Sequence, residues 1–99
     1  MTFALFESEV NDIIHGGFIY SASVHAINAQ NTDDLSILDL RITACALGLD
    51  ISHADSVRTF VNGVNFEGCT NDVSAAGATN PWWGTNIDKD GNLDVGIEP

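Results

Sequence analysis

Apolar residues follow two different spacings in the first third of the chain. Up to Gly16-Gly17 they lie at the spacing of one helix face: Phe3, Phe6, Val10, Ile13 and Ile14. From Phe18 to Ala29 the spacing changes to two, as in a strand with one apolar face. The pattern predicts a helix followed by one long strand or two short ones.

Two further helices are predicted in the middle of the chain. Asn31 to Asp34 offers a capping residue and two carboxylates where a helix N-terminus favours them. An apolar stripe then continues to about Gly48 through Leu35, Leu38, Ile42 and Cys45. A shorter helix is predicted from Ser52-His53-Ala54-Asp55 to Asn62-Gly63, with an apolar face made by Val57, Phe60, Val61 and Val64. We expect no internal repeat.

The last third of the chain predicts a loop and a hairpin. Residues 65–80 are rich in small and polar residues, which is typical of a loop. Two strand-like runs, 82–88 and 92–98, flank Lys89-Asp90-Gly91, and Asp-Gly between such runs favours a hairpin turn. The expected order is α-β-α-α-β-β. This order predicts a single α+β domain over residues 1–99, with helices packed on a small antiparallel sheet; the alternative is a mainly α core with an irregular C-terminal tail.

The charge balance excludes some partners. Fourteen acidic residues and three basic ones give a formal net charge of −11 at pH 7. Direct binding to nucleic acid or to an anionic membrane surface requires clustered Lys and Arg, and Arg41, Arg58 and Lys89 are scattered. The expected partner is therefore a basic protein surface, which a negative field attracts.

Residues 1–10 do not resemble a secretory signal. They contain no Lys or Arg, and Glu7 and Glu9 interrupt the apolar run that such a signal needs. No segment reaches the ~18 apolar residues of a membrane span. We expect a cytoplasmic location, or an extracellular one if the chain is a processed fragment.

Two cysteines, Cys45 and Cys69, leave two alternatives open. In a reducing compartment they are buried thiols, and in an oxidising one a disulfide between them would close a loop of about 25 residues. Neither belongs to a Cys-x-x-Cys pair, and no histidines stand at ligand spacing, so a zinc site is not expected.

One acidic segment has the spacing of a calcium loop. Asn86, Asp88, Asp90 and Asp94 match positions 1, 3, 5 and 9 of an EF-hand, and Gly91 matches the turn at position 6. Position 12 is Ile97 instead of a bidentate Glu, so any calcium affinity should be weak. The other interpretation is a hairpin with solvated carboxylates; no other cofactor is expected.

The favoured function is non-catalytic binding. No nucleophile–base signature or phosphate loop occurs in the sequence, so an enzyme is not expected. The main hypothesis is a small acidic inhibitor of a nucleic-acid-binding protein, similar in size and charge to phage anti-restriction and anti-CRISPR proteins. A second interpretation is that the acidic charge only keeps the domain soluble. The alternative of another class is a surface or extracellular module with the calcium loop and a disulfide.

The first partner-binding candidates are three acidic residues and one aromatic. Asp33, Asp34 and Asp39 are expected on one exposed helix. Trp82 and Trp83 are neighbours in a predicted strand and point to opposite faces, so one can lie in the core while the other is exposed. We select Trp83 as the candidate interface residue.

Overall fold

The computed structural model describes residues 4–7, 12–53 and 57–94, and in these ranges the chain forms ten strands and no helix. The strands, in chain order, are β1 (Ala4–Glu7), β2 (Ile13–Tyr20), β3 (His25–Gln30), β4 (Ser36–Thr43), β5 (Leu47–Asp50), β6 (Phe60–Asn62), β7 (Asn71–Ser74), β8 (Trp82–Trp83), β9 (Asn86–Ile87) and β10 (Leu93–Asp94). No helix that could cross a membrane is found in this part of the chain. The cytoplasmic location remains a prediction.

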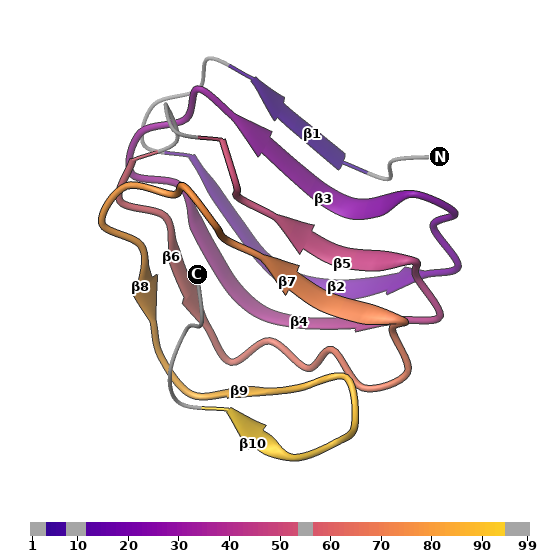
Figure 1. Ribbon diagram of the computed structural model, residues 1–99. Helices are drawn as coiled ribbons and strands as arrows, with labels where there is room; N and C mark the ends of the chain where they lie inside the picture. The colour runs from indigo at the N-terminus through magenta and orange to yellow at the C-terminus, as the bar shows by residue number, and fades with distance from the viewer. Residues whose placement is uncertain (1–3, 8–11, 54–56, 95–99) are drawn as a thin grey trace.

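Successive strands alternate between two parallel sheets (Figure 1). One sheet has the order β1-β3-β5-β7 and the other the order β2-β4-β6-β8, and each neighbouring pair is parallel. The chain therefore winds in circuits, and each circuit places one strand in each sheet on top of the strand from the circuit before. This arrangement is a parallel β-solenoid.

The circuits have nearly constant length. In the first sheet Ile27 lies beside Ala4, Leu47 beside His25 and Asn71 beside Leu47. The second sheet pairs Ile13 with Ser36 and Phe60 with Trp82, at almost the same separations along the chain. The expectation of no internal repeat is wrong, because the structure repeats once per circuit, with a period of roughly 23 residues that is typical of a solenoid.

Each circuit bends at corresponding positions through single residues in the left-handed backbone region. One such column is Asp34, Arg58 and Asn80, with φ of 58°, 55° and 49°. Two more columns are Gly16, Asp39 and Gly63, and Ser21, Ala44 and Gly68. A left-handed residue turns the strand while the chain on both sides stays extended, and stacking of the circuits holds non-glycine residues in this conformation.

The space between the sheets is filled by stacked apolar side chains. Ile37 and Val61 are register partners and are fully buried, and Phe66 is the largest fully buried side chain. Trp83 stacks on Phe66 at a centroid distance of 6.0 Å and an interplanar angle of 8°. The core is therefore continuous from circuit to circuit along the axis of the solenoid.

The predicted α+β fold with helices on an antiparallel sheet is wrong, and so is the mainly α alternative. The helix expected from Leu35 to Gly48 is in fact β4 with its flanking corner. Its buried residues are Leu35, Ile37, Leu40, Ile42 and Cys45, and the left-handed residues Asp39 and Ala44 shift the alternation by one position at each bend. The resulting spacings of two and three resemble the three-and-four spacing of a helix face.

The other two predicted helices are also wrong in the described residues. The first is replaced by β1 and the start of β2, and residues 1–3 and 8–11 of its predicted span lie outside the described part. Gly16-Gly17 and Gly63 are bends between extended segments and not helix ends. The chain over Phe60–Asn62 is strand β6, whereas residues 54–56 of the expected helix start lie outside the described part. The segment 65–80, expected as loop, contributes β7.

The predicted C-terminal hairpin is confirmed over residues 86–94. Trp82–Trp83 of the first predicted run form β8, which pairs in parallel with β6, and residues 95–98 of the second run lie outside the described part. β9 and β10 pair antiparallel, and the amide of Asp88 donates to the carbonyl of Asn92 at 2.8 Å across the turn. Gly91 has a φ of 85°, which is the left-handed conformation that glycine adopts at low cost. This hairpin is correctly predicted because its signal is local.

Cys45 and Cys69 are both free and buried. Burial raises the pKa of the Cys69 thiol from 9.0 to about 11. A rise of this size leaves about 100-fold less of the reactive thiolate at pH 8. We therefore expect an aromatic disulfide reagent to modify the native Cys69 thiol at least ~100-fold more slowly than the same thiol of the unfolded chain in guanidinium.

A cysteine at position 76 is the matched control for that measurement. Ala76 is exposed, so the Ala76→Cys variant should react at the rate of a free thiol while Cys45 and Cys69 do not. Rapid reaction of two thiols in the native wild-type protein would contradict the buried placement.

Candidate functional site

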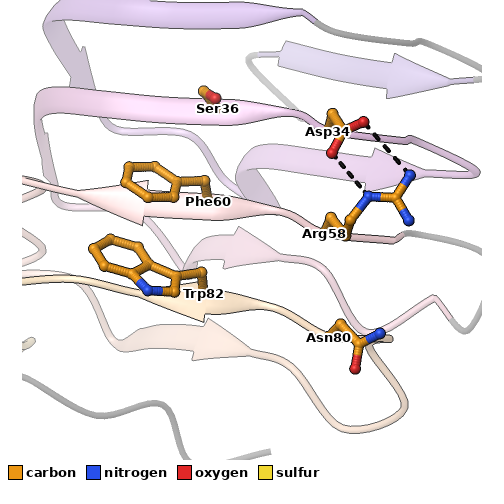
Figure 2. A pocket seen from close by; sticks show the side chains of 6 residues that line it. All are labelled: Asp34, Ser36, Arg58, Phe60, Asn80 and Trp82. Atoms are coloured by element: carbon orange, nitrogen blue, oxygen red, sulfur yellow. Dashed lines mark hydrogen bonds and ion pairs between the residues drawn. The ribbon is translucent and has the colours of Figure 1, made fainter.

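Six side chains from three consecutive circuits line an open depression of about 470 Å³ on the outer face of the β4–β6–β8 sheet (Figure 2). We call it the β4–β6–β8 groove. Its residues form two columns: Asp34, Arg58 and Asn80 in one, and Ser36, Phe60 and Trp82 in the other. Since partners in a parallel sheet stand above one another, one position in each circuit builds one column.

The two columns lie side by side because each residue of the first is two positions before a residue of the second. In an extended chain, positions i and i+2 point to the same face. Asp34 and Ser36 on one circuit therefore face the same way as Arg58 and Phe60 on the next. The three residues of the first column, Asp34, Arg58 and Asn80, are themselves in the left-handed region, and they form one rim of the groove.

The aromatic part of the groove is a stacked pair. The rings of Phe60 and Trp82 are parallel within 1°, with centroids 4.0 Å apart. Trp82 remains 50% exposed. Gly84 makes room for this ring, because a Cβ at position 84 would stand 2.8 Å from Cζ3 of Trp82. The groove thus presents a fixed aromatic surface to solvent.

The charged part of the groove is an ion-pair cluster. Arg58 donates from Nε to Asp34 Oδ1 at 2.9 Å, and its Nη2 donates to Asp33. The hydrogen bond from Arg58 holds the pKa of Asp34 below its ordinary value, and the same bond raises the pKa of Arg58. Both groups stay ionised near neutral pH, and each is held in place by the other.

The carboxylates selected as partner-binding candidates do not form one free acidic face. Asp33 and Asp34 are bound to Arg58, and Asp39 is 3.1 Å from Nε2 of His15. They lie on β4 and the corner before it, not on a helix. Binding to a basic protein surface therefore remains a prediction, and Arg58 partly neutralises two of the residues chosen for it, Asp33 and Asp34.

The structure places Trp83 in the core and Trp82 on the surface. The prediction that neighbouring Trp side chains part to opposite faces is confirmed, and the selected residue, Trp83, is the buried one. Partner binding through Trp83 remains a prediction. The alternation of side chains along a strand determines that the two Trp residues point to opposite faces. Which of them is buried depends on which face of the sheet is turned toward the core.

The predicted calcium ligands do not converge among the described side chains. Asn86 is buried, its Oδ1 accepts from the amide of Val64 at 2.8 Å, and its Nδ2 donates to the carbonyl of Val61 at 3.3 Å. Asp88 accepts from the amides of Asp90 and Asn92, as in an ordinary turn. Asp90 pairs with Lys89.

Calcium therefore has no assembled site in this part of the chain. The side chain of Asp94 lies outside the described residues, although its backbone pairs in β10. No group of three or more His, Cys, Asp or Glu side chains that could hold a metal is found among the described residues. The hairpin interpretation of this segment accounts for the observed hydrogen bonds.

Sequence reasoning misses most of the groove. The apolar pattern puts Phe60 on a helix face, and it does not single out Arg58, Ser36 or Asn80 as site residues. The available signal is the repeat of positions. Asp34-x-Ser36, Arg58-x-Phe60 and Asn80-x-Trp82 occupy equivalent positions in successive circuits, although their residue types differ. Comparison with family models, curated proteins and solved structures gave no match for this chain.

Proposed function

We propose that this protein is a non-catalytic carbohydrate-binding protein that holds a neutral sugar in the β4–β6–β8 groove. The observation that carries the proposal is the parallel Phe60–Trp82 pair, with Trp82 half-exposed, beside the Asp34–Arg58 ion pair in one open depression. Both features come from adjacent circuits of a rigid sheet, so neither has to be ordered when a ligand binds.

The two parts of the groove complement the two kinds of surface on a sugar. A pyranose presents C–H groups on its faces and hydroxyls around its rim. The π face of an aromatic ring is negative and attracts the C–H groups, while carboxylate, guanidinium and amide groups bond the hydroxyls. An apolar surface with a few fixed polar groups is the usual composition of a specific binding site.

The net negative charge of the groove rim and of the whole chain favours an uncharged ligand. Asp33, Asp34 and Arg58 together carry one net negative charge at the rim, and the whole chain carries −11. This field repels phosphates, sulfates and uronic acids. It does not disfavour a neutral sugar, whose binding depends on stacking and hydrogen bonds.

The lining of the groove favours binding over hydrolysis of a glycosidic bond. Hydrolysis by most glycosidases needs two carboxyl groups, one of which keeps its proton near neutral pH. Asp34 is the one carboxylate among the six lining residues, and Arg58 lowers its pKa. A carboxylate held in this way is a hydrogen-bond acceptor and a poor proton donor.

Calorimetric titration of the full chain with neutral gluco-, manno-, galacto- and xylo-oligosaccharides tests the proposal. We expect at least one series to bind, and the Trp82→Ala variant to bind it at least ~10-fold more weakly, which corresponds to ~1.4 kcal/mol of lost stacking and desolvation. Phe18→Ala is the matched control, because Phe18 is 61% exposed and lies outside the groove.

Salt separates this proposal from binding to a basic protein. Binding of a neutral sugar should change less than about twofold between low salt and ~0.5 M NaCl, whereas attraction between charged proteins is screened over that range. Absence of binding in all four series, or equal affinity of the wild type and the Trp82→Ala variant, would refute the proposal. Circular dichroism of each variant confirms that it is folded.

A further inference from the structure

One column of the groove changes from large to small side chains along the solenoid axis. Ile13, Ser36, Phe60 and Trp82 are register partners on four consecutive strands of the sheet. We call the place of one strand in this column a level. Phe60 and Trp82, the aromatic ladder, occupy the last two levels, and Ser36 occupies the level directly before Phe60. Ile13, at the level beyond Ser36, is 67% exposed. A small residue therefore lies between larger ones.

This change leaves one face of Phe60 without a stacking partner in the column. The ring of Phe60 is parallel to that of Trp82, so its stacked face is turned toward β8 and its other face toward the level of Ser36. The serine side chain ends at Oγ and cannot cover a six-membered ring. Figure 2 shows Ser36 at the level next to Phe60, with the Asp34–Arg58 pair farther along the same two strands.

We infer that the level of Ser36 is the subsite for a single neutral sugar ring, which stacks on the face of Phe60 that is turned away from Trp82. This inference rests on the proposed function and assigns the position and size of the occupant. The ring would take the place that an aromatic side chain at position 36 would fill, and would extend the Phe60–Trp82 ladder by one level.

The spacing of the sheet suits a saturated ring. Adjacent strands are about 4.8 Å apart, whereas carbon atoms in contact are about 3.5–4.0 Å apart. Two flat aromatic rings on adjacent strands must lean together to touch, as the 4.0 Å separation of Phe60 and Trp82 shows. A pyranose is thicker than an aromatic ring because hydrogens and hydroxyls project from both faces, so it fills one strand spacing without such leaning.

Polar groups suited to hydroxyls border this level. Ser36 lies at the floor and offers one donor and two acceptor sites through its hydroxyl. Asp34 is two residues earlier on the same face, and its carboxylate is fixed by Arg58 at 2.9 Å. A sugar stacked on Phe60 would therefore have its rim toward groups whose positions are already determined. This arrangement selects for hydroxyl-bearing rings over purely apolar ones.

Filling the subsite is the direct test. The Ser36→Phe variant should lose affinity for the oligosaccharide identified above by at least ~10-fold, because the new ring occupies the face of Phe60. Its melting temperature should stay equal or rise, since the new ring stacks on Phe60. Ser36→Ala, which keeps the space, should lose no more than a few-fold. Ser23→Phe adds the same bulk at an exposed position outside the groove and should bind as the wild type does.

A second variant covers the case in which Ser36→Phe does not fold. Phe60→Leu keeps an apolar side chain but removes the flat face, so it should weaken binding at least as much as Trp82→Ala. If Ser36→Phe folds and binds with wild-type affinity while Trp82→Ala is impaired, the subsite assignment is wrong and the proposed function survives. If Phe60→Leu binds as the wild type does, the assignment is likewise wrong. If no neutral oligosaccharide binds the wild type, both fail.

Discussion

The Phe66→Ala variant is expected to lose about 3–5 kcal/mol of unfolding free energy, the usual cost of truncating a fully buried Phe. Phe66 is 0% exposed and packs on Trp83 and over Gly48, where a Cβ would stand 2.6 Å from Cδ1 of the ring. The backbone around Gly48 is paired in the sheet and cannot collapse into the cavity. Chemical denaturation, with the slope and midpoint both measured, gives this loss.

Phe66→Leu is the control for that measurement. Leucine retains most of the volume and should cost about 1–1.5 kcal/mol. A loss below ~1.5 kcal/mol for Phe66→Ala would show that the ring is not in the core. Since a domain of this size has about 5–15 kcal/mol of total stability, the alanine variant should be close to unfolding at ~37 °C.

The Asn86→Ala variant is expected to lose about 1–3 kcal/mol, although it removes only a small polar group. The amide of Asn86 satisfies the N–H of Val64 and the carbonyl of Val61 inside the fold. Alanine leaves the buried N–H of Val64 without this partner, whereas the carbonyl of Val61 still accepts from the amide of Gly84 at 2.8 Å. An unsatisfied buried donor costs about 1–3 kcal/mol. Thermal and chemical denaturation of the variant measure the loss.

Asn92→Ala is the matched control in the same hairpin. The Asn92 side chain is exposed, and its carbonyl makes the turn hydrogen bond through the backbone, which alanine retains. Its effect should stay within about 0.5 kcal/mol. Equal and small effects of the two substitutions would contradict the internal role of Asn86 and would make its oxygen available again as a calcium ligand.

The failure of the helix predictions between Leu35 and Cys69 has a single geometric cause. A strand that runs straight buries every second residue, but here Asp39 and Ala44 each insert one left-handed residue between buried pairs. The buried positions of this circuit are therefore Leu35, Ile37, Leu40, Ile42 and Cys45. The same spacing of buried positions returns one circuit later at Thr59, Val61, Val64, Phe66 and Cys69. Within one circuit this spacing fits a helix almost as well as a strand.

Two aligned circuits distinguish the two interpretations. Ile37 and Val61, Leu40 and Val64, and Cys45 and Cys69 are all separated by the same interval, and a fixed interval of this length favours a solenoid. The repeat is difficult to detect because the identities differ between circuits and the circuit length varies by a residue or two. The class of side chain and the position of each bend recur from circuit to circuit, but the residue identities do not.

The sequence by itself determined the local features of this protein. The hairpin at Lys89-Asp90-Gly91, the division of Trp82 and Trp83 between two environments, and the acidic surplus all depend on neighbouring residues or on composition. The tertiary structure decided the parallel pairing, the exposure of Trp82 and the groove. These depend on contacts between residues a full circuit apart, and Asp34 meets Arg58, as Phe60 meets Trp82, only because successive circuits stack in register.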